Sequence, residues 1–231
     1  MKRLEPLLGR ANEPDVATLD ELRECSSFLA TSEVLSIVRS ALLNVGPYGQ
    51  RRHISMLGPV LSGRPDREVM GVAAWLDQWD NRLERSRVLA RILGSLGDVG
   101  TGVCAPFMER LSSDHYDASA IAGDLGGAFP NMPRSRCDKI CGILLTKEAA
   151  RTPDNSGYDN TLSMFLRLRH LSPQMQEAVF SKAKEIWDGI PAGPGGRNLM
   201  AFDFSVEYQY RDVVQACAPE LRDKWIALLA T

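Results

Sequence analysis

The sequence predicts an all-α protein in which about five antiparallel helical hairpins stack into a right-handed solenoid. Three observations predict this fold. Apolar residues recur at three- and four-residue steps, as they do on one face of a helix. The helix pairs recur at intervals of roughly 30 to 50 residues, and every turn inside a pair holds a proline. The alternative is a non-repetitive helical bundle with a short strand near 201–211.

The stretch 86–114 shows the hairpin most clearly. Its first half carries an apolar helical stripe, formed by Val88, Leu89, Ile92, Leu93, Leu96 and Val99. Three glycines, Gly97, Gly100 and Gly102, are expected to break this helix. Ala105-Pro106 is then expected to open the second helix, because a proline in the first helical turn loses no needed donor. Neither helix can bury its stripe alone, so neighbouring hairpins are required.

Similar pairs are expected along the whole chain, with first helices that begin near 34, 86, 118, 159 and 201. In one of them Ser172 is placed as an N-cap and Pro173 as the first helical residue. Residues 1–17 are predicted to be a loosely held leader, and residues 18–231 a single helical domain that starts with a capping box at Thr18. The turn-rich stretches 151–157 and 190–198 are interpreted as loops between repeats.

The segment 201–211 is ambiguous between helix and strand. Its aromatic and branched residues alternate strictly with polar neighbours, which favours a strand. No comparably strong partner strand is found elsewhere, and an isolated strand would leave its backbone groups unpaired, which favours a helix. Both readings stay open.

Composition and charge limit the classes of function that the chain can have. The chain has 231 residues, a net charge of −2 and 44% hydrophobic residues, so it has no basic surplus for a nucleic-acid backbone. Its 5 cysteines form no CxxC pair and are interpreted as reduced thiols of a cytoplasmic protein. The N-terminus does not have the pattern of a secretory signal, and no stretch is apolar enough for a membrane span.

Helix pairs of this period resemble the HEAT-like family of α-solenoids over residues 31–231. The resemblance is carried by the spacing and by Leu93-Gly94-Ser95-Leu96, Leu125-Gly126-Gly127 and Leu171-Ser172-Pro173. It implies a scaffold that presents a curved helical surface to a partner.

Trp75 and Trp79 lie four residues apart, so on one helix they share a face, with Asp77 and Asp80 on another side. Some HEAT-like DNA glycosylases place tryptophans and an aspartate in a concave site for a damaged base, so the resemblance implies DNA binding or glycosylase activity as the alternative function. Core or interface packing of the two indoles is favoured over such a site, because the chain lacks the basic surplus that holds DNA.

A basic run from Arg82 to Arg91 follows and could meet a phosphate or an acidic partner, although acidic residues are interleaved with it.

Cys137 and Cys141 share a helical face but lack further zinc ligands at a suitable spacing, so they are assigned to the core. The glycines of 94–102 lack the ending of a phosphate-binding loop, and no sequence motif indicates a catalytic triad.

The sequence therefore favours a non-catalytic module that binds another protein or a larger assembly, with no cofactor, metal or membrane. Aromatic and arginine residues are the usual anchors of such surfaces. The nominated anchors are Trp75, Trp79, Arg82, Trp187 and Trp225.

Overall fold

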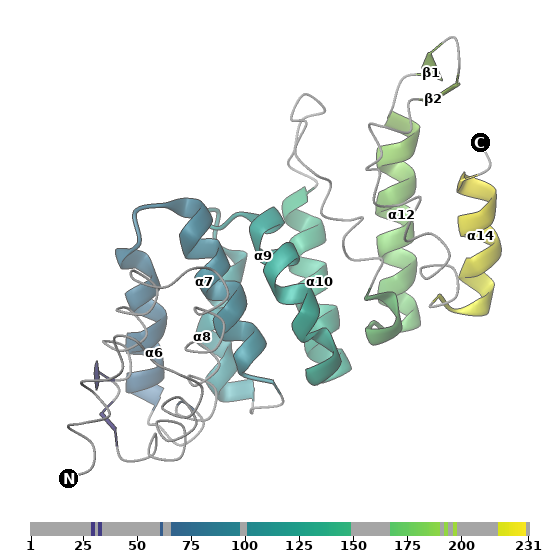
Figure 1. Cartoon of the computed structure of the whole chain (residues 1–231). Helices are drawn as coiled ribbons and strands as arrows, with labels where there is room; N and C mark the ends of the chain where they lie inside the picture. The colour runs from purple at the N-terminus through teal and green to yellow at the C-terminus, as the bar shows by residue number, and fades with distance from the viewer. Residues whose placement is uncertain are drawn as a thin grey trace, which may run out of the picture. The chain divides into compact units, whose positions relative to one another are not determined.

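The computed structural model describes residues 29–30, 32–33, 61, 66–97, 101–148, 167–189, 192–193, 196–197 and 217–229. Over these ranges the chain is predominantly helical, which confirms the all-α class (Figure 1). Contacts divide the chain into two compact units, Met1–Tyr116 and Asp117–Thr231. The predicted leader 1–17, the helix at Thr18, the helix near 34 and the ambiguous segment 201–211 lie outside the described residues.

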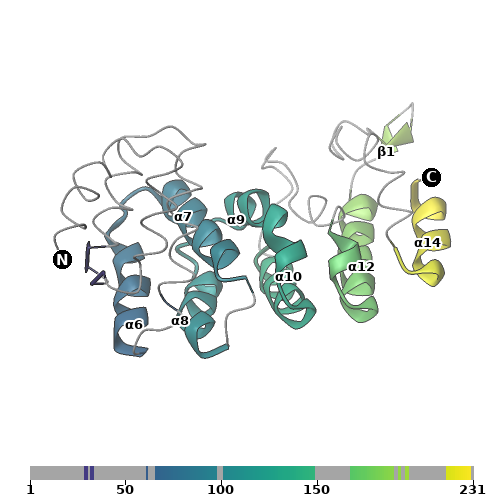
Figure 2. The same cartoon turned by 60° about the horizontal axis from the view of Figure 1, so that its bottom comes forward.

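The first unit contains three described α-helices. Helix α6 (Asp66–Trp75) continues as the short 3-10 helix η2 (Leu76–Gln78), and α7 (Arg82–Ser95) and α8 (Thr101–Ser112) follow. Helix α8 packs against both α6 and α7, so the predicted hairpin within 86–114 is present (Figure 2). The apolar stripes meet in the core of this unit, which includes Val69, Val72, Leu89, Ile92, Leu93, Phe107 and Leu111.

The ends of α7 are fixed by local chemistry. At its start the Asn81 side chain accepts hydrogen bonds from the backbone N–H groups of Leu83 at 2.9 Å and Glu84 at 3.2 Å. These are two of the donors that a helix leaves unsatisfied at its first turn. Just beyond the helix, Gly97 has a φ of 50°. A side chain would be strained in this left-handed conformation, so glycine favours the end of the helix there.

Helix α8 begins earlier than the sequence predicted. The expected start was Ala105-Pro106, but the helix begins at Thr101 and holds Pro106 in its interior. Gly102, expected to break the structure, is itself helical and exposed. A proline at this position removes the bond to the carbonyl four residues earlier, which belongs to Gly102. Because Gly102 is exposed, water can hydrate that carbonyl, and the helix can continue through the proline.

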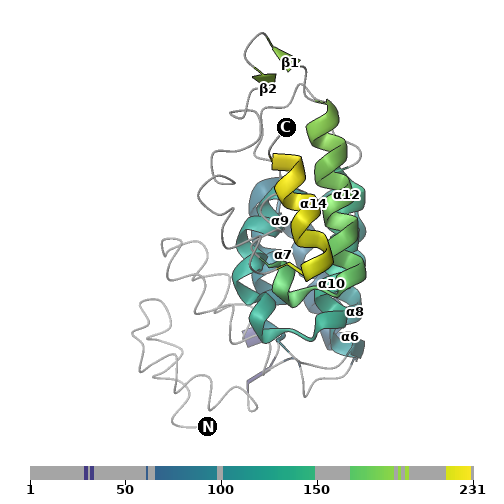
Figure 3. The ribbon, with the colours of Figure 1, turned by 90° about the vertical axis from the view of Figure 1, so that its right-hand side faces the viewer.

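The second unit begins with α9 (Ala118–Leu125), the 3-10 helix η3 (Gly126–Asn131) and α10 (Arg134–Glu148). After a further 3-10 turn, η4 (Leu168–His170), come α12 (Pro173–Gly189) and α14 (Pro219–Leu229). Helix α10 packs against α9 and α12, and α12 packs in turn against α14. Figure 3 shows α12 and α14 side by side. Each described α-helix of this unit thus packs on the next one along the chain.

The predicted start of α12 is confirmed. The Ser172 hydroxyl accepts a hydrogen bond from the backbone N–H of Met175 at 3.3 Å, and Pro173 is the first helical residue. The backbone N–H of Ser172 donates to Asp138 of α10 at 2.9 Å. This contact joins the beginning of α12 to the preceding helix.

A buried amide connects the last helix of the unit to α12. Gln176 donates through Nε2 to the carbonyl oxygens of Leu168 at 2.7 Å and Leu171 at 3.2 Å. Its Oε1 accepts from the backbone N–H of Ala218, just before α14, at 3.0 Å. On the surface, Lys224 of α14 pairs with Glu177 of α12 at 2.7 Å.

The predicted loop 190–198 contains a short pair of antiparallel strands. Strand β1 (Ala192–Gly193) pairs with β2 (Gly196–Arg197), with Ala192 opposite Arg197.

Over the described ranges, no helix combines the length and apolarity that a bilayer span needs.

Candidate functional site

The backbone changes direction between the two tryptophans of the first unit. The spacing of Trp75 and Trp79 predicted that one helix carries both, but α6 ends at Trp75 and Trp79 has an extended conformation, with φ −87° and ψ 114°. The two rings nevertheless meet edge to face, with centroids 5.6 Å apart and planes at 90°. Trp75 is buried and Trp79 is half-buried. The expected proximity of the indoles is therefore confirmed, while the helix expected to produce it is not.

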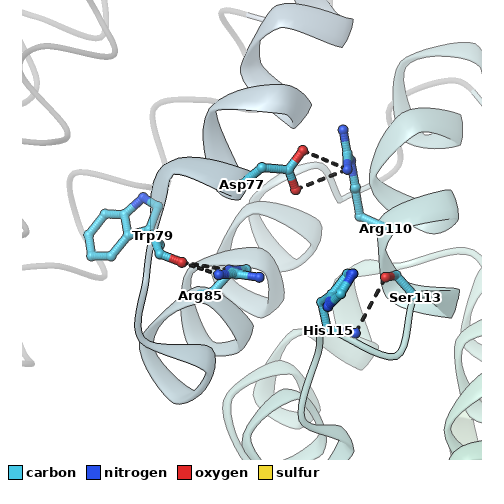
Figure 4. Close-up of polar contacts among 6 residues, drawn as sticks. All are labelled: Asp77, Trp79, Arg85, Arg110, Ser113 and His115. Carbon is cyan, nitrogen blue, oxygen red and sulfur yellow. Dashed lines mark hydrogen bonds and ion pairs between the residues drawn. The ribbon is translucent and has the colours of Figure 1, made fainter.

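The Trp79 backbone is held by an arginine of the next helix. Arg85 donates to the carbonyl oxygen of Trp79 through Nε at 2.8 Å, and Nη2 donates to the same oxygen (Figure 4). The Asn81 cap fixes the chain two residues further on. The loop that carries Trp79 is thus attached to α7 by a side chain and by a helix cap.

Asp77 is paired with a residue of α8. Nη1 of Arg110 lies 2.9 Å from Oδ1 and 2.7 Å from Oδ2 of Asp77, as Figure 4 shows. The side chains are 34% and 48% exposed, so water weakens this attraction. A pair of this kind contributes at most about 1 kcal/mol to stability. The pair does, however, orient both groups and occupies the carboxylate of Asp77.

Tyr116 lies beside these charged groups at the end of the first unit. Its side chain is 2% exposed, and Arg82 donates to its carbonyl oxygen at 3.2 Å. Its buried hydroxyl has no hydrogen-bond partner within the described part of the chain. Burial raises the pKa of this phenol, and Asp77 raises it further, while Arg110 and Arg85 act in the opposite direction.

These contacts define the Tyr116 cluster: Asp77, Arg82, Arg85, Arg110 and Tyr116. Three arginines against one aspartate give the cluster a formal charge of +2. Only Arg110 has a carboxylate partner in it, since Arg82 and Arg85 donate to neutral carbonyl groups. Figure 4 also shows His115, whose backbone N–H donates to the Ser113 hydroxyl at 3.4 Å. Arg82 and Arg85 belong to the basic run predicted from the sequence, whereas the places of Arg110 and Tyr116 in the cluster were not predicted.

The large apolar side chains that are exposed differ from the anchors nominated from the sequence. The large hydrophobic side chains exposed in the described ranges are Met70, Leu83 and Ile226. Leu83 is 43% exposed in the first turn of α7, between Arg82 and Glu84. None of these three residues is among the anchors nominated from the sequence. The charged neighbours of Leu83 are a signal that this leucine faces water.

The nominated anchors fall into different environments. Trp75 is buried, and Trp225 is buried against Phe180 at a ring-centroid distance of 4.7 Å, so both pack in the cores of their units. Their burial disfavours them as surface anchors. Trp79 is half-buried and Arg82 is exposed, and the structure brings them near Trp75 and Tyr116. Trp187 belongs to α12, but its side chain lies outside the described residues.

The cysteines of the second unit have the environment of packing residues. Cys137 and Cys141 are buried on α10, and Cys217 is buried before α14. Burial raises the pKa values of the Cys137 and Cys217 thiols to about 11, so little thiolate is present at neutral pH. Within the described ranges, His, Cys, Asp and Glu side chains form no group of three that could hold a metal.

The imidazole of His170 is engaged in a contact with its neighbour. Nε of Arg169 donates to Nε2 of His170 at 2.9 Å. Burial lowers the pKa of His170, and the charges of Arg169, Arg134 and Arg167 lower it further. This nitrogen already accepts a hydrogen bond from Arg169, which leaves it poorly placed to act as a general base.

Comparison of the chain with protein-family models, curated proteins and solved structures finds no match.

Proposed function

We propose that this chain is a non-catalytic module that binds another protein through the surface at the start of α7, around Trp79, Arg82 and Leu83. In this proposal the helical hairpins stack as a solenoid of the HEAT-like type, and the surface belongs to its first described unit. The packing of α6 and α7 on α8, and of α9, α10, α12 and α14 in sequence, supports such an arrangement.

The observation that carries the proposal is the combination of a fixed, half-exposed tryptophan with an exposed leucine. Arg85 and Asn81 hold the loop of Trp79, so docking a partner there costs little conformational entropy. Leu83 leaves apolar surface in water that a partner could cover. Tryptophan and arginine are the residue types most enriched among the residues that dominate binding energy at protein interfaces.

The test compares two residues of the proposed surface with one exposed apolar residue of the other unit. Trp79→Ala and Leu83→Ala are expected to reduce capture of a partner from native cell extract by about tenfold or more, which is the usual effect of removing a central anchor. Ile226→Ala, an exposed residue of α14, is the matched control and should capture normally. Thermal melts establish that the variants fold. Normal capture by folded Trp79→Ala and Leu83→Ala proteins would remove this surface from consideration.

The DNA glycosylase alternative draws less support from the geometry. Asp77 is engaged by Arg110, and Trp75 is buried, so neither is presented together with Trp79 to a flipped base. Binding of duplex DNA at low salt, reduced by Trp79→Ala, would favour this alternative over a protein partner.

A further inference from the structure

We propose that the partner segment recognised at this surface is acidic, with a carboxylate that pairs with the arginines at the start of α7 and an apolar neighbour that covers Leu83. This inference rests on the proposed function and names the chemical class of its partner. The observations that carry it are the bonding partners of the arginines and the position of the exposed leucine among them.

Two arginines of α7, Arg82 and Arg85, are oriented by neutral groups and pair with no carboxylate among the described residues. Helix α7 contains four arginines and one glutamate, Glu84, which gives 4 − 1 = +3. The guanidinium groups of Arg82 and Arg85 donate to the carbonyl oxygens of Tyr116 and Trp79. A carbonyl fixes the direction of a guanidinium without cancelling its charge. Both groups therefore keep a full positive charge in a defined position.

A third arginine next to them is also available. Arg87 is exposed and lies four residues after Leu83, on the same face of α7. Among the described residues it forms no hydrogen bond or ion pair. Arg82 and Arg87 thus flank an exposed leucine, an arrangement that suits a partner combining a carboxylate with an aliphatic or aromatic side chain.

The nearby acids do not satisfy these arginines. Asp77 is taken by Arg110 of α8. Asp80 and Glu84 are exposed, and neither forms an ion pair with a described residue. The charges of Asp80 and Glu84 keep the local excess of positive charge small, and a small excess suits a short acidic segment better than a long polyanion. The chain's net charge of −2 also opposes extended nucleic acid, because such binding needs a broad basic surface.

The experiment uses the full chain and labelled synthetic peptides of alternating glutamate and leucine. Binding is measured by fluorescence anisotropy at low and at physiological salt. We expect the peptide to bind and to weaken as salt rises, because charge pairs at the rim of an interface are screened. Arg82→Gln combined with Arg87→Gln should weaken binding about tenfold. Arg134→Gln, an exposed arginine at the start of α10 in the other unit, is the control and should bind normally.

The single variant Arg87→Gln separates a loss of binding from a loss of folding, because this exposed side chain has no hydrogen bond or ion pair to lose among the described residues. It should weaken binding by a smaller factor while the thermal melt is unchanged. Equal binding of a glutamine–leucine peptide, or equal weakening by Arg134→Gln, would overturn the acidic class. Tighter binding of duplex DNA than of the peptide would overturn both this inference and the proposed function. No peptide binding, alongside capture of a cellular protein that still depends on Trp79, would overturn this inference alone.

Discussion

The guanidinium of Arg167 occupies the space that a side chain at Gly126 would fill. Gly126 is buried at the start of η3, and Arg167 precedes η4, so the contact joins two 3-10 turns of the second unit. Burial lowers the pKa of Arg167 from its ordinary value, as expected for a cation withdrawn from water. The missing side chain of a glycine is therefore what lets a charged group pack close to the backbone.

Gly126→Ala should destabilise the protein by about 1–3 kcal/mol, because the new methyl group must displace the Arg167 side chain. The control is Gly123→Ala in α9, where an added methyl group meets nothing within 4 Å. That substitution should stabilise by about 0.5–1 kcal/mol, since alanine favours a helix over glycine. Urea denaturation of both variants measures the difference. Equal effects at the two positions would contradict the role assigned to Arg167.

Tyr116→Phe should leave stability unchanged or raise it by up to about 1 kcal/mol. The hydroxyl of Tyr116 is buried without a partner among the described residues, so its removal relieves an uncompensated desolvation. The measurement is the free energy of unfolding at neutral pH. A loss of about 1 kcal/mol or more would show that the hydroxyl is bonded in solution, for instance to an ordered water.

Gln176→Leu should cost about 3 kcal/mol of stability. The substitution keeps an apolar side chain of similar size but removes three hydrogen bonds. The carbonyl groups of Leu168 and Leu171 and the N–H of Ala218 then lose their partner. Gln174→Leu changes an exposed glutamine of the same helix and should alter stability by no more than about 0.5 kcal/mol. If both variants melt alike, Gln176 does not hold the chain before α14 to α12.

His170 should make the folded protein less stable as the pH falls below about 6.5. Its pKa in the folded protein lies below the ordinary 6.5, so the unfolded chain takes up the proton first as pH falls. Its contribution is fully present above about pH 6.5 and is lost as the pH falls through the folded pKa. Stability measured across this window should fall less steeply for His170→Gln than for the unmodified chain.

Periodicity was sufficient to predict the hairpin formed by α7 and α8 and the start of α12. Both depend on local chemistry: an apolar stripe at helical spacing, and a serine cap followed by proline. The burial of Cys137 and Cys141 followed from their spacing on one face of α10. Elements of this kind are specified by residues close together in the sequence.

The break between Trp75 and Trp79 was not predicted, because residues distant in the sequence contribute to it. Asp77 pairs with Arg110 of α8, and Arg85 binds the carbonyl of Trp79. One local signal was available. The sequence Asn81-Arg82-Leu83-Glu84 resembles a capping box, which would have placed a new helix start at Arg82. An N-cap requires an extended residue, and a helix running through to position 81 is incompatible with it.

The Tyr116 cluster and the contact of Arg167 with Gly126 arise only when separate segments pack. No periodic pattern shows that Arg110 will reach Asp77 or that a guanidinium will lie over a particular glycine. The same holds for the anchors: tryptophan is a plausible anchor by type, yet Trp75 and Trp225 are large apolar groups that the cores of their units enclose.

The edge-to-face contact of Trp75 and Trp79 gives the protein an intrinsic optical reporter of the proposed surface. The two indoles lie 5.6 Å apart, and Trp75 is buried in the core while Trp79 is partly exposed to water. A ligand that covers Trp79 removes water from this indole and not from the enclosed Trp75, so the fluorescence emission of Trp79 shifts to shorter wavelength. Occupancy of the loop can thus be followed in the unlabelled protein.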